Sequence, residues 1–333
     1  VGEVIGDGYD VLGVLAAGGA ADASAYVVFG QSGNVNVDIS AIAAGNSSFG
    51  FKIDDLPTSQ PNDRVTSHGD FNNDGLDDFM LCTGNGTDTT YVVFGKTNSA
   101  TVSLTTLTTT ANSTGAKFTP PSGYNGSAEN MLGDINGDGY EDYGMLLNTI
   151  GTSNYNVYQI RYGASTLPTT FDTPNAAPNG GATANGYTLK GTMSYVSGAI
   201  GADINNDGYS DVIARSGIGA TAYLDVMFGS AIGLTATPSV TLNIITASMG
   251  QGPADGAGYR ISMAGAYSIP DHVYATGDLN GDGLLDIVTS VNSTIAPTTA
   301  TTGTYVYFGQ TSSNDYDGMS LTTGTSTNGF FIK

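Results

Sequence analysis

The most informative segment of this chain is the acidic run Asp70-Phe-Asn-Asn-Asp-Gly-Leu-Asp-Asp78. The same pattern recurs three times, as Asp134-Ile-Asn-Gly-Asp-Gly-Tyr-Glu-Asp142, Asp203-Ile-Asn-Asn-Asp-Gly-Tyr-Ser-Asp211 and Asp278-Leu-Asn-Gly-Asp-Gly-Leu-Leu-Asp286. A degraded copy opens the chain as Glu3-Val-Ile-Gly-Asp-Gly-Tyr-Asp-Val11. Neighbouring copies lie 64 to 75 residues apart, and this spacing indicates five repeats of one structural unit.

Other features keep the same period. Each acidic segment is followed by an apolar run and then by a second run that ends in an aromatic residue and glycine, such as Tyr26-Val-Val-Phe-Gly30 and Tyr91-Val-Val-Phe-Gly95. A third apolar piece follows, such as Phe49-Gly-Phe-Lys-Ile53, and a fourth leads into the next acidic segment. Short runs bounded by Gly, Asn and Asp are typical of strands, and no window shows sustained helical periodicity. Each repeat therefore predicts about four short strands.

One such four-stranded sheet cannot bury both of its faces, whereas several sheets stacked around an axis can. We therefore predict an all-β fold, a β-propeller of five four-stranded blades, forming a single domain over residues 1–333. The expected blades are approximately residues 1–62, 63–122, 123–192, 193–265 and 266–333.

The acidic loops and the Tyr-Val-Val-Phe-Gly strands resemble the FG-GAP, or integrin-α-like, repeat, and the bacterial variety of it most of all. The resemblance covers nearly the whole chain, although the Gly-Ala-Pro of the family is replaced, for example by Cys82-Thr-Gly84. It implies a calcium-binding propeller in an extracellular protein, commonly part of a larger adhesin or surface protein. Propellers of this family usually have seven blades, so the alternative is that the five repeats belong to a seven-bladed, integrin-like propeller.

The chemistry of the acidic loops points to calcium. Positions 1, 3, 5 and 9 carry side-chain oxygens, position 7 offers a backbone carbonyl, and the glycine at position 6 permits a tight turn around one point. Calcium takes six to eight oxygen ligands, whereas carboxylates crowded together without a cation repel one another. An EF-hand is excluded because position 12 is never Glu. It is Leu81, Met145, Ala214 or Thr289.

We therefore predict about four Ca²⁺ sites, one in each intact loop. The expected ligands are Asp70, Asn72, Asp74, Leu76 and Asp78; Asp134, Asn136, Asp138, Tyr140 and Asp142; Asp203, Asn205, Asp207, Tyr209 and Asp211; and Asp278, Asn280, Asp282, Leu284 and Asp286.

The first loop is expected to be empty or weak, because Ile5 and Val11 replace ligands three and nine and only Glu3 and Asp7 remain. At position 8, Asp77 and Glu141 are interpreted as solvated charges outside the ligand set.

Composition excludes several classes of partner. The chain has 9 Lys and Arg against 30 Asp and Glu, a net charge of −21, whereas nucleic-acid binding needs clustered basic residues. Membrane insertion is not expected, since the most apolar stretch is far shorter than the ~20 residues of a span. The one cysteine, Cys82, cannot form an internal disulfide and is interpreted as a small buried apolar residue, so calcium is expected to supply the rigidity.

Catalysis is not indicated, so we do not expect an enzyme. His68 and His272 belong to no metal-binding or catalytic pattern, and no nucleophile elbow or phosphate-binding loop occurs. The segments that differ most between repeats are the expected binding loops, and they are Thr101–Thr110, Asn175–Gly186 and Ser230–His272.

The expected function is that of a calcium-stabilised extracellular or cell-surface adhesion module, which recognises a glycan or protein through its loops within a larger surface or secreted protein. One alternative is a structural building block that self-assembles into an extracellular fibre or surface layer. The other is a polysaccharide-active enzyme built on a lyase-like propeller.

Overall fold

The computed structural model of the 333-residue chain describes most of the five repeats. The described residues are 3–16, 24–33, 35–46, 48–56, 64–83, 89–149, 156–165, 181–183, 186–190, 199–218, 221–231, 258–264, 273–291, 303–317, 321 and 327–332. His272, most of Asn175–Gly186 and most of Ser230–His272 lie outside these residues, as does the side chain of His68.

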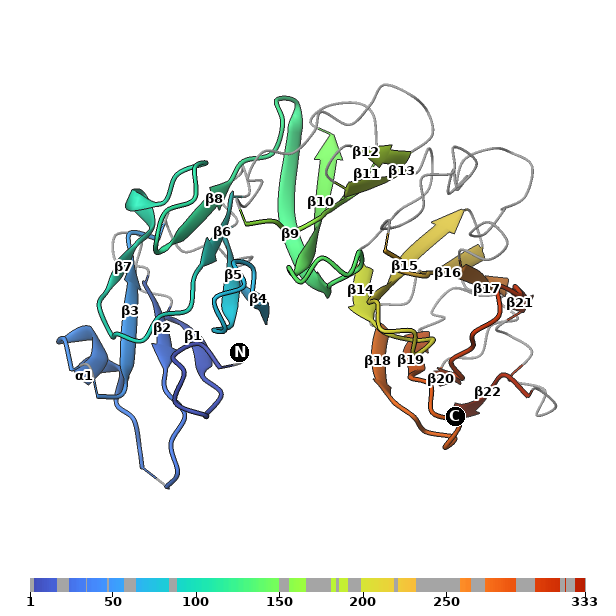
Figure 1. The fold of residues 1–333 in the computed structure, drawn as a ribbon, viewed down its shortest axis with the longest axis horizontal. Coiled ribbons are helices and arrows are strands. Elements are labelled where there is room, and N and C mark those ends of the chain that lie inside the picture. Colours follow the sequence, from blue (N-terminus) through green and yellow to red (C-terminus); the bar gives the residue numbers. More distant parts are fainter. Residues whose placement is uncertain are drawn as a thin grey trace. The chain divides into compact units, whose positions relative to one another are not determined.

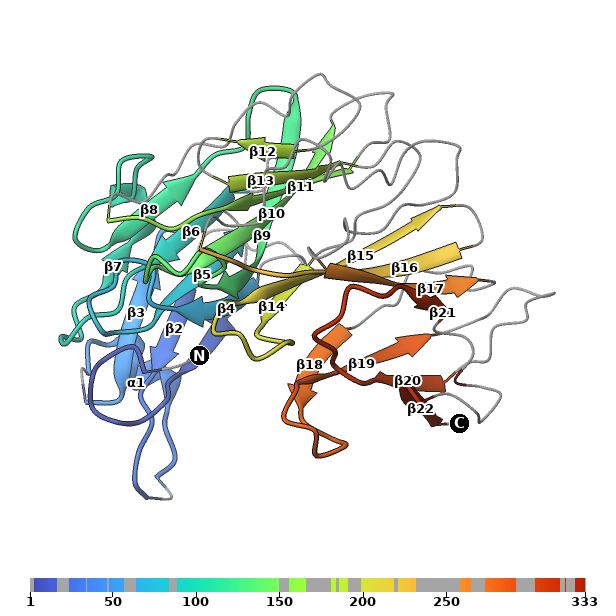
Figure 2. The same ribbon diagram turned by 45° about the vertical axis from the view of Figure 1, so that its right-hand side comes forward.

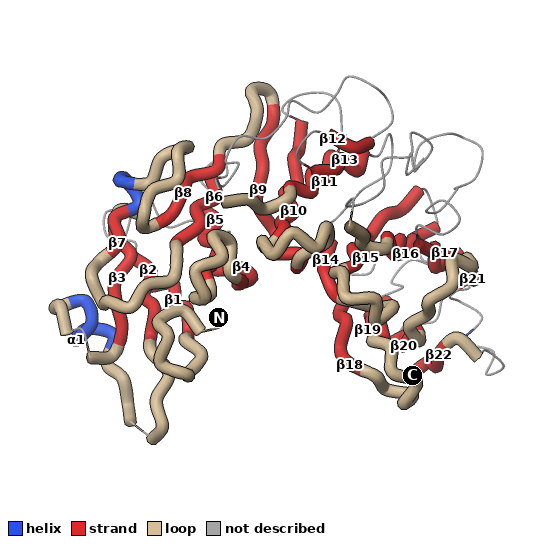
Figure 3. Tube along the Cα trace, in the orientation of Figure 1, coloured by secondary structure: helices blue, strands red, loops and turns tan. Residues whose placement is uncertain are grey.

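The prediction of an all-β chain is confirmed, because strands dominate the trace (Figure 3). The strands of five sheets follow one another along the chain, from blue to red in Figure 1. Sheet 1 is β1 (Leu12–Ala16), β2 (Ser24–Val28), β3 (Gly50–Asp54) and β7 (Val102–Ser103). Sheet 2 is β4 (Arg64–Gly69), β5 (Asp78–Thr83), β6 (Thr89–Val93) and β8 (Gly115–Phe118).

The remaining sheets repeat the plan of sheet 2, and sheets 3 and 4 each have one further strand. Sheet 3 has the order β12 (Gly181–Thr183), β13 (Gly186–Lys190), β11 (Asn156–Arg161), β10 (Asp142–Thr149) and β9 (Tyr124–Gly133). Sheet 4 is β14 (Ala199–Ala202), β15 (Asp211–Ile218), β16 (Thr221–Met227), β17 (Gly258–Ala264) and β21 (Tyr316–Asp317). Sheet 5 is β18 (Val273–Gly277), β19 (Asp286–Val291), β20 (Gly303–Tyr307) and β22 (Gly329–Ile332), which lie side by side in Figure 2.

Two short strands depart from the expected boundaries of the repeats. Strand β7 belongs to the second repeat by sequence, yet it pairs in parallel with β3 of the first, Ile53 opposite Val102. Strand β21 of the fifth repeat pairs in the same way with β17 of the fourth, Ile261 opposite Tyr316. The other strand pairs whose register the structure describes are antiparallel. A segment of one repeat therefore extends the sheet of the preceding repeat.

Two short helical elements lie wholly within the described part of the chain. One is α1 (Ile39–Ala43), where the Asp38 carboxylate accepts a hydrogen bond from the Ser40 N–H and Ile42 is buried. The other is the 3₁₀ turn Leu104–Thr106. A five-residue helix is too short to leave a periodic pattern in the sequence. None of the described helices is long and apolar enough to cross a membrane.

By their contacts the residues group into two compact units. Unit 1 comprises Val1–Met131 and Gly163–Thr173, and unit 2 comprises Leu132–Tyr162 and Pro174–Lys333. The single domain over residues 1–333 and the five blade boundaries stay predictions.

Within each unit, the apolar core forms between consecutive sheets. In unit 1, Val27 and Phe51 of sheet 1 pack in one cluster with Phe79 and Tyr91 of sheet 2. In unit 2, sheet 4 is buried on both faces, because Val212 and its neighbours on one face cluster with residues of sheet 3, and those on the other face cluster with residues of sheet 5. Burial on both faces explains why these strands read as continuous apolar runs rather than as alternating ones.

Candidate metal centre

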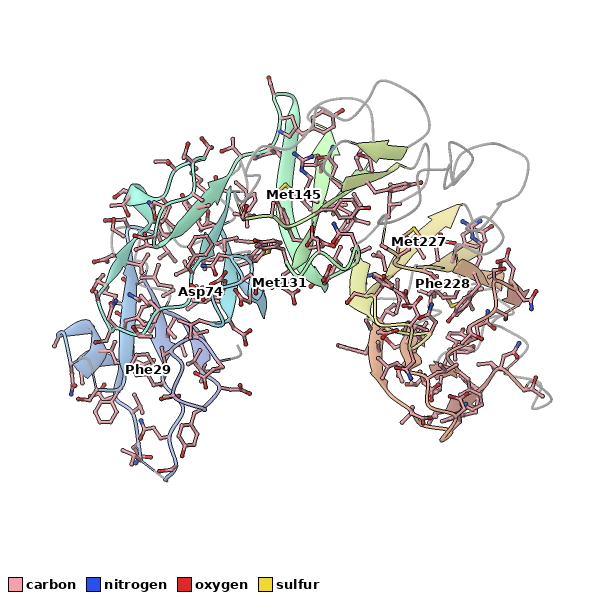
Figure 4. All side chains as sticks on the ribbon, viewed as in Figure 1. Phe29, Asp74, Met131, Met145, Met227 and Phe228 are labelled. Carbon is pink, nitrogen blue, oxygen red and sulfur yellow. The ribbon has the colours of Figure 1, made fainter. Side chains whose placement is uncertain are left out.

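Each intact acidic loop connects two neighbouring strands of one sheet. The loop of residues 70–78 joins β4 to β5, and Figure 4 labels Asp74 within it. The corresponding loops join β9 to β10, β14 to β15 and β18 to β19, in sheets 3, 4 and 5. The four donor sets therefore occupy one position in the repeated plan.

Left-handed backbone conformations at two positions, 4 and 6, make the loop tight. The glycine at position 6 has φ of 89° at Gly75 and 93° at Gly208. Position 4 is also left-handed, with φ of 56° at Asn73 and 70° at Gly137. Asn and Gly are the residues that adopt this conformation at the lowest cost, which explains why position 4 is always one of the two.

The carboxylate at position 1 lies at the centre of the loop. Asp70 accepts hydrogen bonds from the N–H groups of Asp74 at 3.0 Å and Gly75 at 2.7 Å. The corresponding bonds to Asp134, Asp203 and Asp278 are 2.8–3.1 Å long. Hydrogen bonds from the Gly283, Gly281 and Asp282 N–H groups also hold the pKa of the Asp278 carboxyl below its usual range, so that it stays charged.

The side chains at positions 3 and 5 bond to each other, and the position-5 N–H donates to the side chains at both positions 1 and 3. Asn72 accepts from the Asp74 N–H at 2.9 Å, and its amide donates to Asp74 Oδ2 at 3.0 Å. The same pair of bonds occurs at Asn136, Asn205 and Asn280, within 0.2 Å of these lengths. At position 5, Asp74 Oδ1 accepts from the Leu76 N–H at 2.9 Å, and this bond also recurs in the other three loops. The structure therefore brings positions 1, 3 and 5 together in every intact loop.

This donor set suits a hard divalent cation. The carboxylate at position 1 and the amide oxygen at position 3 share one N–H donor, and each carboxylate keeps lone pairs beyond those that accept N–H groups. Across the described ranges, no group of three or more His, Cys, Asp or Glu side chains is placed to hold a metal ion. A site here would therefore depend on the Asn side chain and on backbone oxygen, as calcium sites commonly do.

The Asp at position 9 is deeply buried and links the loop to the next strand. Asp78, Asp142, Asp211 and Asp286 are all 0% exposed. Oδ2 of Asp78 accepts from the position-2 N–H of Phe71 at 3.0 Å, and its Oδ1 accepts from the Gly95 N–H at 2.7 Å. Asp211 and Asp286 make the same two bonds. This residue ties the loop to the glycine of the Phe-Gly motif, a role that the ligand pattern alone did not predict.

The Phe-Gly motif requires glycine because atoms of the acidic loop lie too close to it for a side chain to fit. A Cβ at Gly95 would lie 2.6 Å from Leu76 Cβ and 2.8 Å from the Asp77 carbonyl oxygen. At Gly229 it would lie 2.4 Å from the Ser210 carbonyl oxygen. Real Cβ atoms do not approach other atoms so closely, so a larger residue would displace the acidic loop that the glycine covers.

Electrostatics within the loop also favour a bound cation. Burial raises the pKa of the Asp78 carboxyl to about 8, against the lowering effect of the Gly95 N–H, and the charges of Asp74 and Asp70 raise it further. Burial likewise raises the pKa of Asp211 to about 7. A divalent cation among these oxygens would favour the charged carboxylates and so offset the cost of burying them.

The first loop keeps the backbone turn with a different set of side chains. The Glu3 carboxylate accepts from the Gly6 and Asp7 N–H groups at 2.7 and 3.0 Å, in the place of an Asp at position 1. Although desolvation acts to raise the pKa of Glu3, these backbone bonds lower it overall. At position 9, Val11 packs into the apolar cluster of unit 1. Positions 3 and 9 carry no side-chain oxygen, which is the basis for expecting an empty or weak site here.

The interpretation of Asp77 as a solvated charge is wrong. Asp77 is half-buried rather than fully solvated, and its Oδ2 accepts a hydrogen bond from the Glu3 N–H at 2.8 Å. The Asp77 N–H in turn donates to the Glu3 carbonyl at 2.9 Å. A contact between residues 74 positions apart leaves no local signal in a single sequence. Asp77 therefore joins the first two repeats.

A buried ion pair in sheet 4 was also missed. Arg260 of β17 and Asp225 of β16 are 2% and 0% exposed, and their side chains form two bonds of 2.5 and 3.1 Å. The guanidinium lies 4.5 Å from the centre of the Tyr223 ring. Asp225 and Arg260 are cross-strand partners, a relation that only the strand register shows.

Cys82 and part of the Thr101–Thr110 segment are packed into the fold. Cys82 is buried on β5, as predicted, with its Sγ 3.5 Å from Thr90 Oγ1. The Thr101–Thr110 segment, an expected binding loop, forms β7 and the 3₁₀ turn and buries Leu104 and Leu107 in the core of unit 1. Part of this segment therefore stabilises the fold.

Comparison of the sequence with models of protein families gives no match, and none of the curated proteins is significantly similar to the chain.

Proposed function

We propose that this chain is a calcium-stabilised extracellular adhesion module, a β-propeller of FG-GAP type that carries about four Ca²⁺ ions and binds a glycan or a protein through its loops. The supporting observation is the repetition of one donor geometry, at positions 1, 3 and 5, in four separate loops. Four independent turns without a common ligand would not need the same two carboxylates and amide in the same arrangement.

Calcium has a structural role in this proposal. Each ion would sit between two strands and neutralise charge next to the buried Asp at position 9, which in turn holds the Phe-Gly glycine. In an extracellular protein without disulfides, such ions supply the rigidity that cross-links give elsewhere. The binding surface for a partner would then lie on loops that a rigid scaffold positions.

The ring is proposed to have five blades, because five sheets account for the five sequence repeats. Membership of a seven-bladed ring remains the alternative, and it differs in requiring two further repeats of the same type.

A binding screen tests the proposed function. The full chain is applied to arrays of glycans and extracellular matrix proteins in millimolar calcium, and again after chelation and after calcium is restored. We expect saturable binding that chelation abolishes and calcium restores. The Asp74→Ala variant, which lacks one ligand and is expected to bind three ions rather than four, should bind the partner more weakly than the wild type at the same calcium concentration.

Absence of binding by a protein that circular dichroism shows to be folded would contradict the adhesion proposal. The same arrays, assayed for shortened polysaccharide chains, separate an adhesin from an enzyme of the lyase type. Release of unsaturated oligosaccharides would favour the enzyme.

A further inference from the structure

Two consecutive acidic loops of unit 2 bond directly to each other. They are residues 134–142, which we call the earlier loop, and residues 203–211, the later loop. The Ser210 N–H, at position 8 of the later loop, donates to the Asp134 carbonyl, at position 1 of the earlier loop, at 3.0 Å. Asp134 is an expected ligand, and Ser210 lies between the expected ligands at positions 7 and 9 of its own loop. One backbone bond therefore joins the two donor sets.

A second path of hydrogen bonds connects the buried carboxylates at position 9 of the two loops. The Ile135 N–H donates to Asp142 Oδ2 at 2.8 Å, and the Ile135 carbonyl accepts from the Ser230 N–H at 3.0 Å. The N–H of the preceding residue, Gly229, donates to Asp211 Oδ1 at 2.9 Å. The two carboxylates are thus held by adjoining backbone groups, so a shift of one loop is transmitted to the other.

A side chain of the later loop also packs on the earlier loop. A Cβ at Gly137, position 4 of the earlier loop, would lie 2.5 Å from Cε1 of Tyr209, position 7 of the later loop. The same two positions meet in unit 1, where a Cβ at Gly6 would lie 3.1 Å from Leu76 Cδ2. Position 7 of a loop therefore contacts position 4 of the loop before it in both units, and neither loop can change shape there without disturbing the other.

An ion in one loop would order backbone groups that the other loop shares. The carboxylates of a loop repel one another until a cation lies between them, so binding holds positions 1 and 9 in place. Because both positions are bonded to the neighbouring loop, the second ion meets a loop that is already partly ordered. Binding of this kind is cooperative even when it involves no further change of structure.

We propose that the calcium sites of the earlier and later loops are coupled, so that an ion in either loop raises the calcium affinity of the other. This inference rests on the proposed calcium binding and concerns how two of those sites are regulated. By linkage each ion raises the affinity for the other by the same factor, which we expect to be roughly tenfold. The pair then fills over a narrower range of calcium concentration than two independent sites, and unit 2 gains its rigidity steeply as calcium rises.

Calcium titration of the full chain, followed by nuclear magnetic resonance after selective ¹⁵N labelling of glycine, tests this proposal. Gly139 and Gly208 at position 6 each donate an N–H to the position-1 carboxylate of their own loop, so each reports one site. We expect both resonances to titrate with a Hill coefficient above 1. Two curves with a Hill coefficient of 1 would overturn the coupling and leave calcium binding intact. Resonances that do not respond to calcium would overturn calcium binding itself.

Ligand variants measure the size of the coupling. Asp138→Ala disables the earlier loop, and it should raise the calcium midpoint that Gly208 reports by roughly threefold, since a tenfold coupling displaces the midpoint of two equal sites by its square root. Asp207→Ala disables the later loop and should raise the midpoint that Gly139 reports by the same factor. Unchanged midpoints in both variants would overturn the proposal.

A further pair of variants tests the junction without removing a ligand oxygen. Position 7 offers its backbone carbonyl, so Tyr209→Ala keeps the donor set of the later loop and removes the ring that packs on Gly137. We expect it to reduce the coupling factor by roughly twofold or more. Tyr140→Ala is the matched control, because position 7 contacts the loop before it and Tyr140 thus lies outside this junction. Equal coupling in the two variants would overturn the assignment of the coupling to this contact.

Discussion

The first two acidic loops, residues 3–11 and 70–78, have similar turns and different chemistry. Both place a carboxylate at position 1 that accepts N–H groups from within the loop, Glu3 in one and Asp70 in the other. Gly8 and Gly75 at position 6 have nearly equal φ, 85° and 89°. At position 9, however, one loop has an apolar valine in the core and the other a buried aspartate that accepts two backbone N–H groups.

This comparison separates the shape of the loop from its capacity to bind a cation. The turn requires a carboxylate at position 1 and a glycine at position 6, and both loops have them. The proposed calcium site has oxygen at positions 3 and 9 as well, where the first loop has Ile5 and Val11. The following four predictions test that separation.

Removal of calcium should have the largest effect. A ligand that binds only the native state stabilises it by about 2.7 kcal/mol per site at a concentration one hundred times Kd. We therefore expect a chelator to lower the melting temperature, measured by circular dichroism, by well over ten degrees for a chain with four such sites. Magnesium in place of calcium should restore little of the loss, because it demands a smaller, octahedral site. An unchanged melt would contradict calcium binding.

Asp78→Val makes position 9 of the second loop like that of the first loop. We expect it to cause the second largest loss in the free energy of unfolding. It leaves the Phe71 and Gly95 N–H groups without their carboxylate, at a cost of about 2–4 kcal/mol in the free energy of unfolding. Denaturant unfolding and a calcium titration should show lower stability and one fewer bound ion. Asp77→Ala is the matched control: it removes the neighbouring carboxylate, costs about 1 kcal/mol through the lost Glu3 bond and keeps the number of ions.

The reverse conversion should create a fifth site. In the double variant Ile5→Asn, Val11→Asp, the first loop gains the oxygens at positions 3 and 9 that the other loops have. We expect calorimetry to count one more calcium ion than in the wild type. Without calcium, the double variant should be less stable than the wild type by about 2 kcal/mol, because it buries a carboxylate with no cation beside it to offset the charge. If the number of bound ions does not rise, positions 3 and 9 do not determine binding.

Replacing the turn glycines with alanine should have the smallest effect on stability. It should also distinguish the two loops by their calcium binding. Both Gly8→Ala and Gly75→Ala force a left-handed alanine into a place where its Cβ meets nothing within 4 Å, at a cost of about 1 kcal/mol each. Only Gly75→Ala should also weaken calcium binding, as measured by titration. Equal calcium affinity in the two variants would show that the turn at Gly75 does not position the ligands.

Much of this fold could be predicted from the sequence. The strands follow the acidic loops, as in β5 after Asp78 and β19 after Asp286, because apolar runs between turn residues have few other stable conformations. The contacts between repeats could not be predicted. The parallel pairing of β7 with β3 involves two residues of ordinary sequence, and the Asp77–Glu3 contact joins distant positions. Local propensity carries no information on either.

In the candidate site, too, local features could be predicted and contacts between distant residues could not. Positions 1, 3 and 5 could be identified because their spacing is local to one turn. The part of position 9 that was missed, its bond to the Phe-Gly glycine, spans 17 residues between Asp78 and Gly95. The Asp225–Arg260 pair, 35 residues apart, needed the register of β16 and β17. These features depend on the sheet already being formed.

Calcium binding at the four loops is tested most directly by isothermal titration of the chelated, refolded chain with calcium. We expect four ions per chain in the wild type, three in Asp74→Ala and four in Gly8→Ala, with the melting temperature rising as the sites fill. Titration without saturable heat, or an equal number of ions in Asp74→Ala and the wild type, would contradict the assignment of these loops as calcium sites.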